Sequence, residues 1–146
     1  MNIAKIVLIE DNSADVLLIE LALKESDILY EMTRFHNGEE AVSALCPPEG
    51  PTTKTLHPDA ILLDLNTPKS DGFVVLEKLR RAPHLAEVPI AIITSSQAMS
   101  DKRRVSLIGR TRYIEKPLQL AEFLTTVGQA VKDLLHLNDK GDLSIR

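Results

Sequence analysis

The stretch Ala60-Ile61-Leu62-Leu63-Asp64 decides the fold, because an uninterrupted apolar run ends there in a carboxylate. Strands that are apolar at every position are typical of parallel sheets covered by helices on both faces. Two comparable runs, 3–9 and 88–94, also end in polar residues, Glu10-Asp11 and Thr94. Ligands of open α/β proteins bind at the edge where the carboxyl ends of parallel strands lie. We therefore expect these polar groups to meet at one edge of a sheet.

Strand-like and helix-like segments alternate five times along the chain, which indicates an α/β domain with a mainly parallel sheet. The strands are expected at 3–9, 30–35, 60–65, 88–94 and 111–115. The second and fifth are short and mixed in polarity, which is typical of edge strands. With right-handed crossovers, the doubly wound order 2-1-3-4-5 places the three apolar strands at the centre.

Five helices are expected from apolar residues that recur three and four positions apart. The spacing is clearest in the first and last helices and weakest in the fourth, within 98–107. The expected apolar faces are Ala14, Leu17, Leu18 and Leu21 in the first helix, Gly38, Ala41, Val42 and Leu45 in the second, Gly72, Val75, Leu76 and Leu79 in the third, and Leu120, Phe123, Leu124, Val127, Val131 and Leu134 in the last.

The composition indicates one globular domain, expected at 1–137, followed by a tail at 138–146 that is too short for an output domain. The chain has 146 residues, of which 44% are apolar and 26% charged, and no apolar run is long enough to cross a membrane. The start of the chain lacks the features of a signal peptide, and the single cysteine, Cys46, cannot form an internal disulfide. A cytoplasmic protein without a membrane partner is expected.

The charge balance disfavours a nucleic-acid partner. The formal net charge is −4, whereas nucleic-acid-binding domains usually present a basic face. The one basic cluster, Lys102-Arg103-Arg104, falls in the expected fourth helix and is interpreted as a solvated face. Segment 46–58 contains four prolines and a glycine and is interpreted as a surface loop, more simply an insertion than a partner contact.

The expected strand order places strand one beside strand three, so Asp11 and Asp64 should face each other with Glu10 close behind. Crowded carboxylates repel one another, and a hard cation bound by oxygen atoms relieves that repulsion. The small number of protein oxygens suits Mg²⁺ or Mn²⁺ better than Ca²⁺. Thr94 and Lys116 could hold phosphoryl oxygens while the Asp64 carboxylate attacks phosphorus. These residues therefore indicate a phosphoryl-transfer site.

At this level of detail the sequence resembles the receiver domains of two-component response regulators, a CheY-like family with the flavodoxin-like fold. The resemblance extends over roughly 3–135, and its motifs are specific in this order and spacing. They are Ile9-Glu10-Asp11-Asn12, Leu62-Leu63-Asp64-Leu65-Asn66 with Pro68 and Asp71-Gly72, Ile93-Thr94-Ser95, and Tyr113-Ile114-Glu115-Lys116-Pro117.

The resemblance implies that Asp64 accepts a phosphoryl group from a histidine kinase. It implies a Mg²⁺ site formed by Asp11, Asp64 and the backbone carbonyl of Asn66, with Glu10 contacting the ion mainly through water. Phosphoryl binding and switching would involve Thr94, Ser95, Lys116 and the aromatic ring of Tyr113. The Lys116-Pro117 bond would be cis. Binding of an unknown downstream protein would change at the surface formed by the fourth helix, fifth strand and fifth helix.

Within the family, the segments 11–15, 62–66 and 94–96 look most like single-domain receivers paired with bacterial and cyanobacterial phytochromes. That similarity implies a red-light-responsive histidine kinase as phosphodonor and a homodimer through the same face. One departure from the common pattern is Arg110-Thr111-Arg112 before Tyr113, which could alter that face. Another is Gln119, a poor helix cap, where the last helix should begin.

Three alternatives remain at this point. An aspartyl-phosphate phosphohydrolase would use the same nucleophile, but the position where such enzymes commonly carry a second aspartate is occupied by Asn66. A flavodoxin-like cofactor binder is disfavoured because the site is acidic and would repel a phosphate-bearing flavin. A receiver that is not phosphorylated and only acts as a scaffold is disfavoured because no site residue is missing. The sequence thus favours a phosphoacceptor that takes part in its own phosphorylation and dephosphorylation, rather than an enzyme with external turnover.

Overall fold

The computed structural model describes residues 3–139 and contains a five-stranded parallel sheet in the order β2-β1-β3-β4-β5. This is the predicted order, with the apolar strands at the centre. The strands are β1 (Ala4–Ile9), β2 (Tyr30–Phe35), β3 (Ala60–Leu63), β4 (Ile90–Thr94) and β5 (Thr111–Glu115). The fourth begins two residues later than expected, after Pro89, which cannot donate a backbone hydrogen bond to a neighbouring strand.

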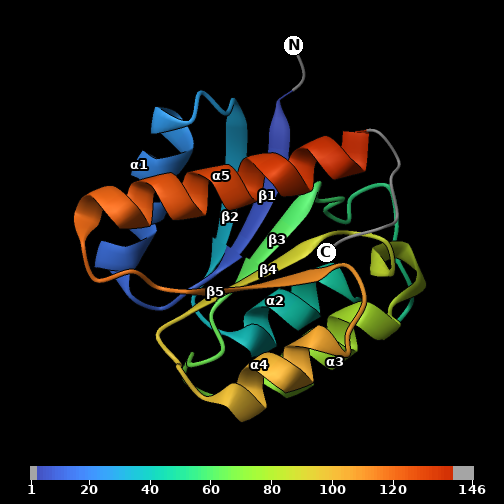
Figure 1. Cartoon of the computed structure of the whole chain (residues 1–146). Coiled ribbons are helices and arrows are strands. Elements are labelled where there is room, and N and C mark those ends of the chain that lie inside the picture. Colours follow the sequence, from blue (N-terminus) through green and yellow to red (C-terminus); the bar gives the residue numbers. More distant parts are fainter. Residues whose placement is uncertain (1–2, 140–146) are drawn as a thin grey trace.

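Helices cover both faces of the sheet, which confirms the doubly wound architecture (Figure 1). They are α1 (Ser13–Glu25), α2 (Gly38–Leu45), α3 (Gly72–Arg81), the short 3₁₀ helix η1 (Pro83–Leu85), α4 (Met99–Ser106) and α5 (Leu120–Asp139). One face carries α1 and α5, and the other carries α2, α3 and α4. Among the described residues, no helix is long and apolar enough to span a membrane.

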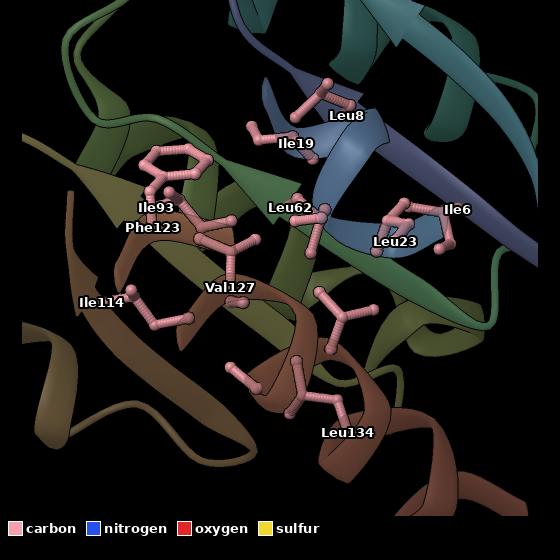
Figure 2. Close-up of a cluster of buried hydrophobic side chains, with 14 of the residues drawn as sticks. Ile6, Leu8, Ile19, Leu23, Leu62, Ile93, Ile114, Phe123, Val127 and Leu134 are labelled. Carbon is pink, nitrogen blue, oxygen red and sulfur yellow. The ribbon is translucent and has the colours of Figure 1, made fainter. Parts of the chain in front are cut away.

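The sheet divides the hydrophobic core into two layers because successive strand residues point to opposite faces. In β3, Leu62 packs toward α1 and α5, whereas Ile61 and Leu63 pack toward α2 and α3. Figure 2 shows the first layer, in which Leu62 lies among side chains of α1, α5 and the neighbouring strands. All four residues of β3 are fully buried, as expected for a central parallel strand.

The buried face of α1 differs from the prediction. Leu17 and Leu21, expected in the core, are 67% and 39% exposed, and the buried apolar positions are instead Val16, Ile19, Ala22 and Leu23. Apolar residues occupy nearly the whole circumference of this helix, so several stripes of helical spacing can be drawn on it. Contact with α5, rather than spacing, selects the buried stripe.

Gly72 sets the distance between α3 and the end of β3. A Cβ atom on this residue would lie 2.5 Å from the Cα atom of Leu65, so any side chain would push the helix away. Asp71 caps the same helix by accepting a hydrogen bond from the Phe73 amide at 2.8 Å. The pair Asp71-Gly72 therefore fixes the short loop that follows Asp64.

The segment between α2 and β3 is a surface loop, as predicted, and it closes on itself. The Gly50 amide donates to the Pro47 carbonyl at 2.9 Å, and the Thr52 amide donates to the Thr55 hydroxyl at 2.9 Å. The loop ends at Asp59, whose carboxylate accepts from the Lys5 amide at the amino end of β1. It is thus attached at the sheet edge opposite the polar strand ends.

Candidate phosphoryl-transfer site

The first carboxylates of the site lie at the ends of two adjacent strands. Ile9 pairs with Leu63, and the Asp64 amide donates to the Ile9 carbonyl at 3.0 Å, which places Glu10 beside Asp64. Both are buried, Glu10 to 1% and Asp64 to 6% relative exposure, while Asp11 is exposed. The predicted meeting of these three residues is therefore observed.

Glu10, Asp11 and Asp64 form a potential metal site. Each can offer one carboxylate oxygen such that the three oxygens lie within 4.8 Å of one another. The Asp11 carboxylate has no hydrogen-bond or ion-pair partner within residues 3–139, so its oxygens are available as ligands. All three donors are oxygens, the type preferred by hard divalent cations such as Mg²⁺ and Mn²⁺.

Lys116 brings a cation into this acidic cluster from the end of β5. Its Nζ atom donates to Asp15 at 2.7 Å, to Glu10 at 2.9 Å and to Asp64 at 2.9 Å. Burial by itself would lower the pKa of this ammonium, but the hydrogen bonds to the three carboxylates outweigh it and raise the pKa. Lys116 is therefore charged at any physiological pH.

Glu10 is the carboxylate whose pKa is most clearly perturbed. Burial raises its pKa from 4.5 to about 7, reinforced by the nearby Asp64 charge and opposed by the hydrogen bond from Lys116. The Asn12 amide also donates to Glu10 at 3.3 Å. Without a bound cation, the site therefore tends to keep a proton on Glu10 near neutral pH.

A chain of hydrogen bonds connects Asp64 with the end of β4. The Asn66 amide donates to Asp64 Oδ1 at 3.0 Å, and the Asn66 side-chain Nδ2 donates to the Thr94 hydroxyl oxygen at 3.1 Å. Thr94 is fully buried, and its hydroxyl also lies 3.4 Å from the Ser96 amide. The Thr94 hydroxyl is thus linked to the Asp64 carboxylate through a single residue.

Tyr113 connects this chain to the surface of the molecule. Its hydroxyl donates to the Ser96 carbonyl at 2.7 Å, and its half-buried ring packs at the edge of the second core layer. Lys102 of α4 lies over the ring at 5.9 Å from its centre and forms an ion pair with Glu115 at 3.4 Å. Ser95, which was expected beside Thr94 in the phosphoryl-binding group, is exposed.

The expected cis bond between Lys116 and Pro117 is not observed. No peptide bond within residues 3–139 is cis. The trans isomer has the lower intrinsic energy for X-Pro bonds. With the bond in the trans form, the Lys116 amide donates to the Thr94 carbonyl at 2.8 Å. The Lys116 side chain still reaches the carboxylates of Glu10, Asp15 and Asp64. The expectation of a cis bond was therefore wrong.

Two site residues were missed in the sequence. Asp15, in the first turn of α1, contacts Lys116, as described above. Arg34 of β2 donates from Nε to the Glu10 carbonyl and from Nη2 to the Asp11 carbonyl, both at 3.0 Å. Asp15 could have been predicted, because it lies one helical turn after Glu10-Asp11 and that turn faces the strand ends. No pattern in the sequence indicates Arg34.

Comparison with known proteins decides the family. A model of the response regulator receiver domain matches residues 6–128. The chain belongs to the receiver domain family. Receiver domains are phosphoacceptor signalling domains that interact with histidine kinases and bind a divalent metal at an acidic site. The acidic cluster found in this receiver has the composition that such a metal requires.

Several relatives of this receiver are associated with phytochromes. It is 36% identical to response regulator Rcp1 of Synechocystis sp. over 96 residues, which are 66% of this chain and 65% of Rcp1. The crystal structure of phosphorylated RcpA, a cyanobacterial phytochrome response regulator, matches with 34% identity and a TM-score of 0.81, covering 92% of this chain and 95% of RcpA. Mn²⁺-bound Rcp1 matches with 30% identity and a TM-score of 0.79, covering 90% and 94% of the two chains.

Proposed function

We propose that this protein is a response regulator that accepts a phosphoryl group on Asp64 from a histidine kinase. The observation that carries this proposal is the position of Asp64, whose Oδ2 atom lies 2.9 Å from the Lys116 ammonium and whose carboxylate offers an oxygen within 4.8 Å of oxygens of Glu10 and Asp11. An anionic phosphoryl group placed on Asp64 would meet positive charge from Lys116 directly. The acidic cluster would need a divalent cation before a second anion could approach.

In the proposed reaction, an Asp64 carboxylate oxygen attacks phosphorus, and the bond from phosphorus to the donor breaks. The donor keeps that electron pair, and the product is an acyl phosphate. The Lys116 ammonium stabilises the negative charge that develops on one phosphoryl oxygen. The Thr94 hydroxyl gives up its hydrogen bond from Asn66 and donates to a second phosphoryl oxygen. Mg²⁺, or Mn²⁺ in its place, would be held by Glu10, Asp11, Asp64 and the backbone carbonyl of Asn66, and would neutralise charge on the same oxygens.

The proposed output is a change in protein binding at the surface of α4, β5 and α5. The Thr94 hydroxyl shares Ser96 with Tyr113, because it lies 3.4 Å from the Ser96 amide, and the Tyr113 hydroxyl donates to the Ser96 carbonyl. Withdrawal of Thr94 toward a phosphoryl group would therefore disturb the bonds that hold Tyr113. Lys102 and Glu115 flank that ring and would transmit the change to the surface.

We further propose that the protein is cytoplasmic, that its donor is a phytochrome histidine kinase, and that it forms a homodimer through the same surface. The support for the donor is the match to RcpA and Rcp1. Support for a protein partner at this surface is a groove of about 480 Å³ on β5 and α5, lined by apolar, polar and charged residues that include Tyr113, Glu115 and Gln129. The ion pair from Arg112 to Asp133 at 3.2 Å crosses the same two elements.

Phosphorylation by acetyl phosphate with Mg²⁺ tests the central proposal. Intact-mass spectrometry should show one added phosphoryl group on the wild type and none on Asp64→Asn. Asp59→Asn is the matched control, because Asp59 precedes the same strand but contacts Lys5 at the opposite sheet edge. Equal labelling of the wild type and Asp64→Asn would refute Asp64 as the acceptor.

The donor and the dimer need separate experiments. Phosphotransfer from a panel of histidine kinases should be fastest from a phytochrome and should respond to red light. Preference for a kinase without a chromophore would refute the phytochrome pairing but not the receiver function. Sedimentation should show a dimer whose fraction rises with acetyl phosphate and Mg²⁺, and a monomer under both conditions would refute the dimer.

A further inference from the structure

The side chain of Asp15 makes the shortest of the three contacts to Lys116, at 2.7 Å. We propose that Asp15 is a positioning residue that holds Lys116 in the resting site and competes with the phosphoryl group for its N–H donors. The proposal rests on the proposed function, because it concerns the same ammonium. It assigns to Asp15 a restraint on phosphorylation rather than a contribution to it.

Lys116 has no spare hydrogen-bond donor in the resting site. A lysine ammonium has three N–H groups, and Lys116 directs them to three carboxylates, on Glu10, Asp15 and Asp64. The ammonium therefore has no spare donor in the resting site. A phosphoryl group on Asp64 would present three oxygens, but only the N–H that now serves Asp64 would be available to them.

Asp15 can release the Lys116 ammonium more easily than Glu10 can. The Glu10 side chain is 1% exposed and would lose its main partner without access to water. The Asp15 side chain is 25% exposed, so water can replace Lys116 as its partner. Asp15 also lies outside the group of carboxylates whose oxygens converge for a metal, so a bound cation would not hold it in place.

Asp15 also adds negative charge to the site. The site holds four carboxylates, on Glu10, Asp11, Asp15 and Asp64, and the Lys116 ammonium contacts all of them except Asp11. A cation in the acidic cluster would directly offset the charges of Glu10, Asp11 and Asp64, but Asp15 would remain paired with Lys116. The approach of an anionic phosphodonor would therefore be opposed by Asp15, which both occupies a donor and adds negative charge.

A purely structural role for Asp15 makes a different prediction. A carboxylate in the first turn of a helix interacts favourably with the helix dipole, and the Asp15 amide donates a hydrogen bond to the side-chain oxygen of the capping residue Asn12. Loss of that role would lower the stability of α1 without accelerating phosphorylation. Glu122 offers a matched control, because it is an exposed carboxylate in the first turn of α5.

The experiment compares initial phosphorylation rates with acetyl phosphate at saturating Mg²⁺ in the full chain. Asp15→Asn should raise the rate about threefold to fivefold, the upper part of the range expected when a partly exposed charged partner is removed. Asp15→Ser should do the same, Asp15→Glu should stay near the wild type, and Glu122→Gln should change the rate less than about twofold. The affinity for beryllofluoride, a phosphoryl mimic, should rise in the same order.

The outcomes separate the two proposals. If the wild type is not phosphorylated, the proposed function fails. The two uncharged variants, Asp15→Asn and Asp15→Ser, are compared at temperatures where melting curves show that both are folded. If the wild type is phosphorylated but these variants react no faster than Glu122→Gln, the restraint is refuted. Acceleration by the two uncharged variants, absent in Asp15→Glu, supports it. Equal acceleration by Glu122→Gln would refute it too, since general charge removal would then suffice.

Discussion

Lys116 and Arg80 lie at opposite ends of the parallel strands. Comparing their hydrogen-bond acceptors distinguishes a cation that serves function from one that serves stability. Each uses all of its N–H donors. Lys116 directs three to carboxylates at the carboxyl ends of the strands. Arg80 directs its five contacts to four backbone carbonyls and a hydroxyl near the amino ends of β4 and β5, on Leu85, Val88, Gly109, Arg110 and Thr111.

The pKa values of the two cations shift in opposite directions. Burial and the neighbouring Arg110 lower the pKa of Arg80 to about 10, although Glu87 opposes the change. The carboxylates raise the pKa of Lys116 despite its burial. The neutral carbonyls around Arg80 connect chain segments through hydrogen bonds and add no negative charge. The carboxylates around Lys116 outnumber it, so the site keeps a negative charge that a bound cation can neutralise. The acidic edge is therefore built for ligands and the other edge for stability.

The largest effect should follow from Lys116→Met. Loss of the ammonium removes a charged donor from the reacting phosphoryl group, and phosphorylation by acetyl phosphate should slow by about 100-fold or more. Lys78→Met, at an exposed lysine of α3, is the control and should keep the wild-type rate. A rate within about threefold of the wild type would show that Lys116 serves structure, as Arg80 does.

Arg80→Met should destabilise the fold by about 2–3 kcal/mol, because several partly buried carbonyls would lose a charged donor. Urea unfolding measures this change. The adjacent Arg81→Met should cost less than about 0.5 kcal/mol, since the Arg81 side chain is 80% exposed. Folded Arg80→Met protein should still be phosphorylated within about threefold of the wild-type rate, and a much larger loss would contradict the division between the two edges.

Stability should depend on pH through Glu10. The pKa of its carboxyl is 4.5 in the unfolded chain and about 7 in the folded protein. Below about pH 4.5 the carboxyl is therefore protonated in both the folded and the unfolded states, and between about pH 4.5 and 7 only the unfolded chain loses the proton. The metal-free protein should therefore lose on the order of 2 kcal/mol of stability as the pH rises through this window. Glu10→Gln should flatten this part of the curve. Chelator-treated samples in urea at several pH values provide the measurement, and an unchanged slope in the variant would assign the dependence to other groups.

The smallest effect should come from Arg34→Lys. A lysine cannot donate to the Glu10 and Asp11 carbonyls with the planar geometry of a guanidinium, so the loop carrying both carboxylates becomes less ordered. Mg²⁺ affinity, measured by calorimetry, should fall about threefold. Arg112→Lys on the other edge strand should leave it unchanged, and an equal fall in both variants would deny Arg34 a specific role.

The sequence was most informative where one pattern had a single interpretation. The continuous apolar run at 60–63 could only be a central strand, and the polar residues after three such runs could only meet at one edge once the strands were parallel. The α1 face was misassigned because Leu17 and Leu21 match helical spacing as well as Ile19 and Leu23 do. In a helix that is apolar on most sides, only the packing partner distinguishes the stripes.

By itself, the sequence determined the doubly wound sheet, its strand order and the convergence of Glu10, Asp11, Asp64, Thr94 and Lys116. These follow from hydrophobic patterning and from the fixed direction of parallel strands, both of which are local or topological. The tertiary structure alone decided that Asp15 shares Lys116, that Arg34 holds the acidic loop and that Arg80 joins the opposite edge. Such contacts depend on the distance between side chains of separate elements, and no periodicity along the chain encodes that distance.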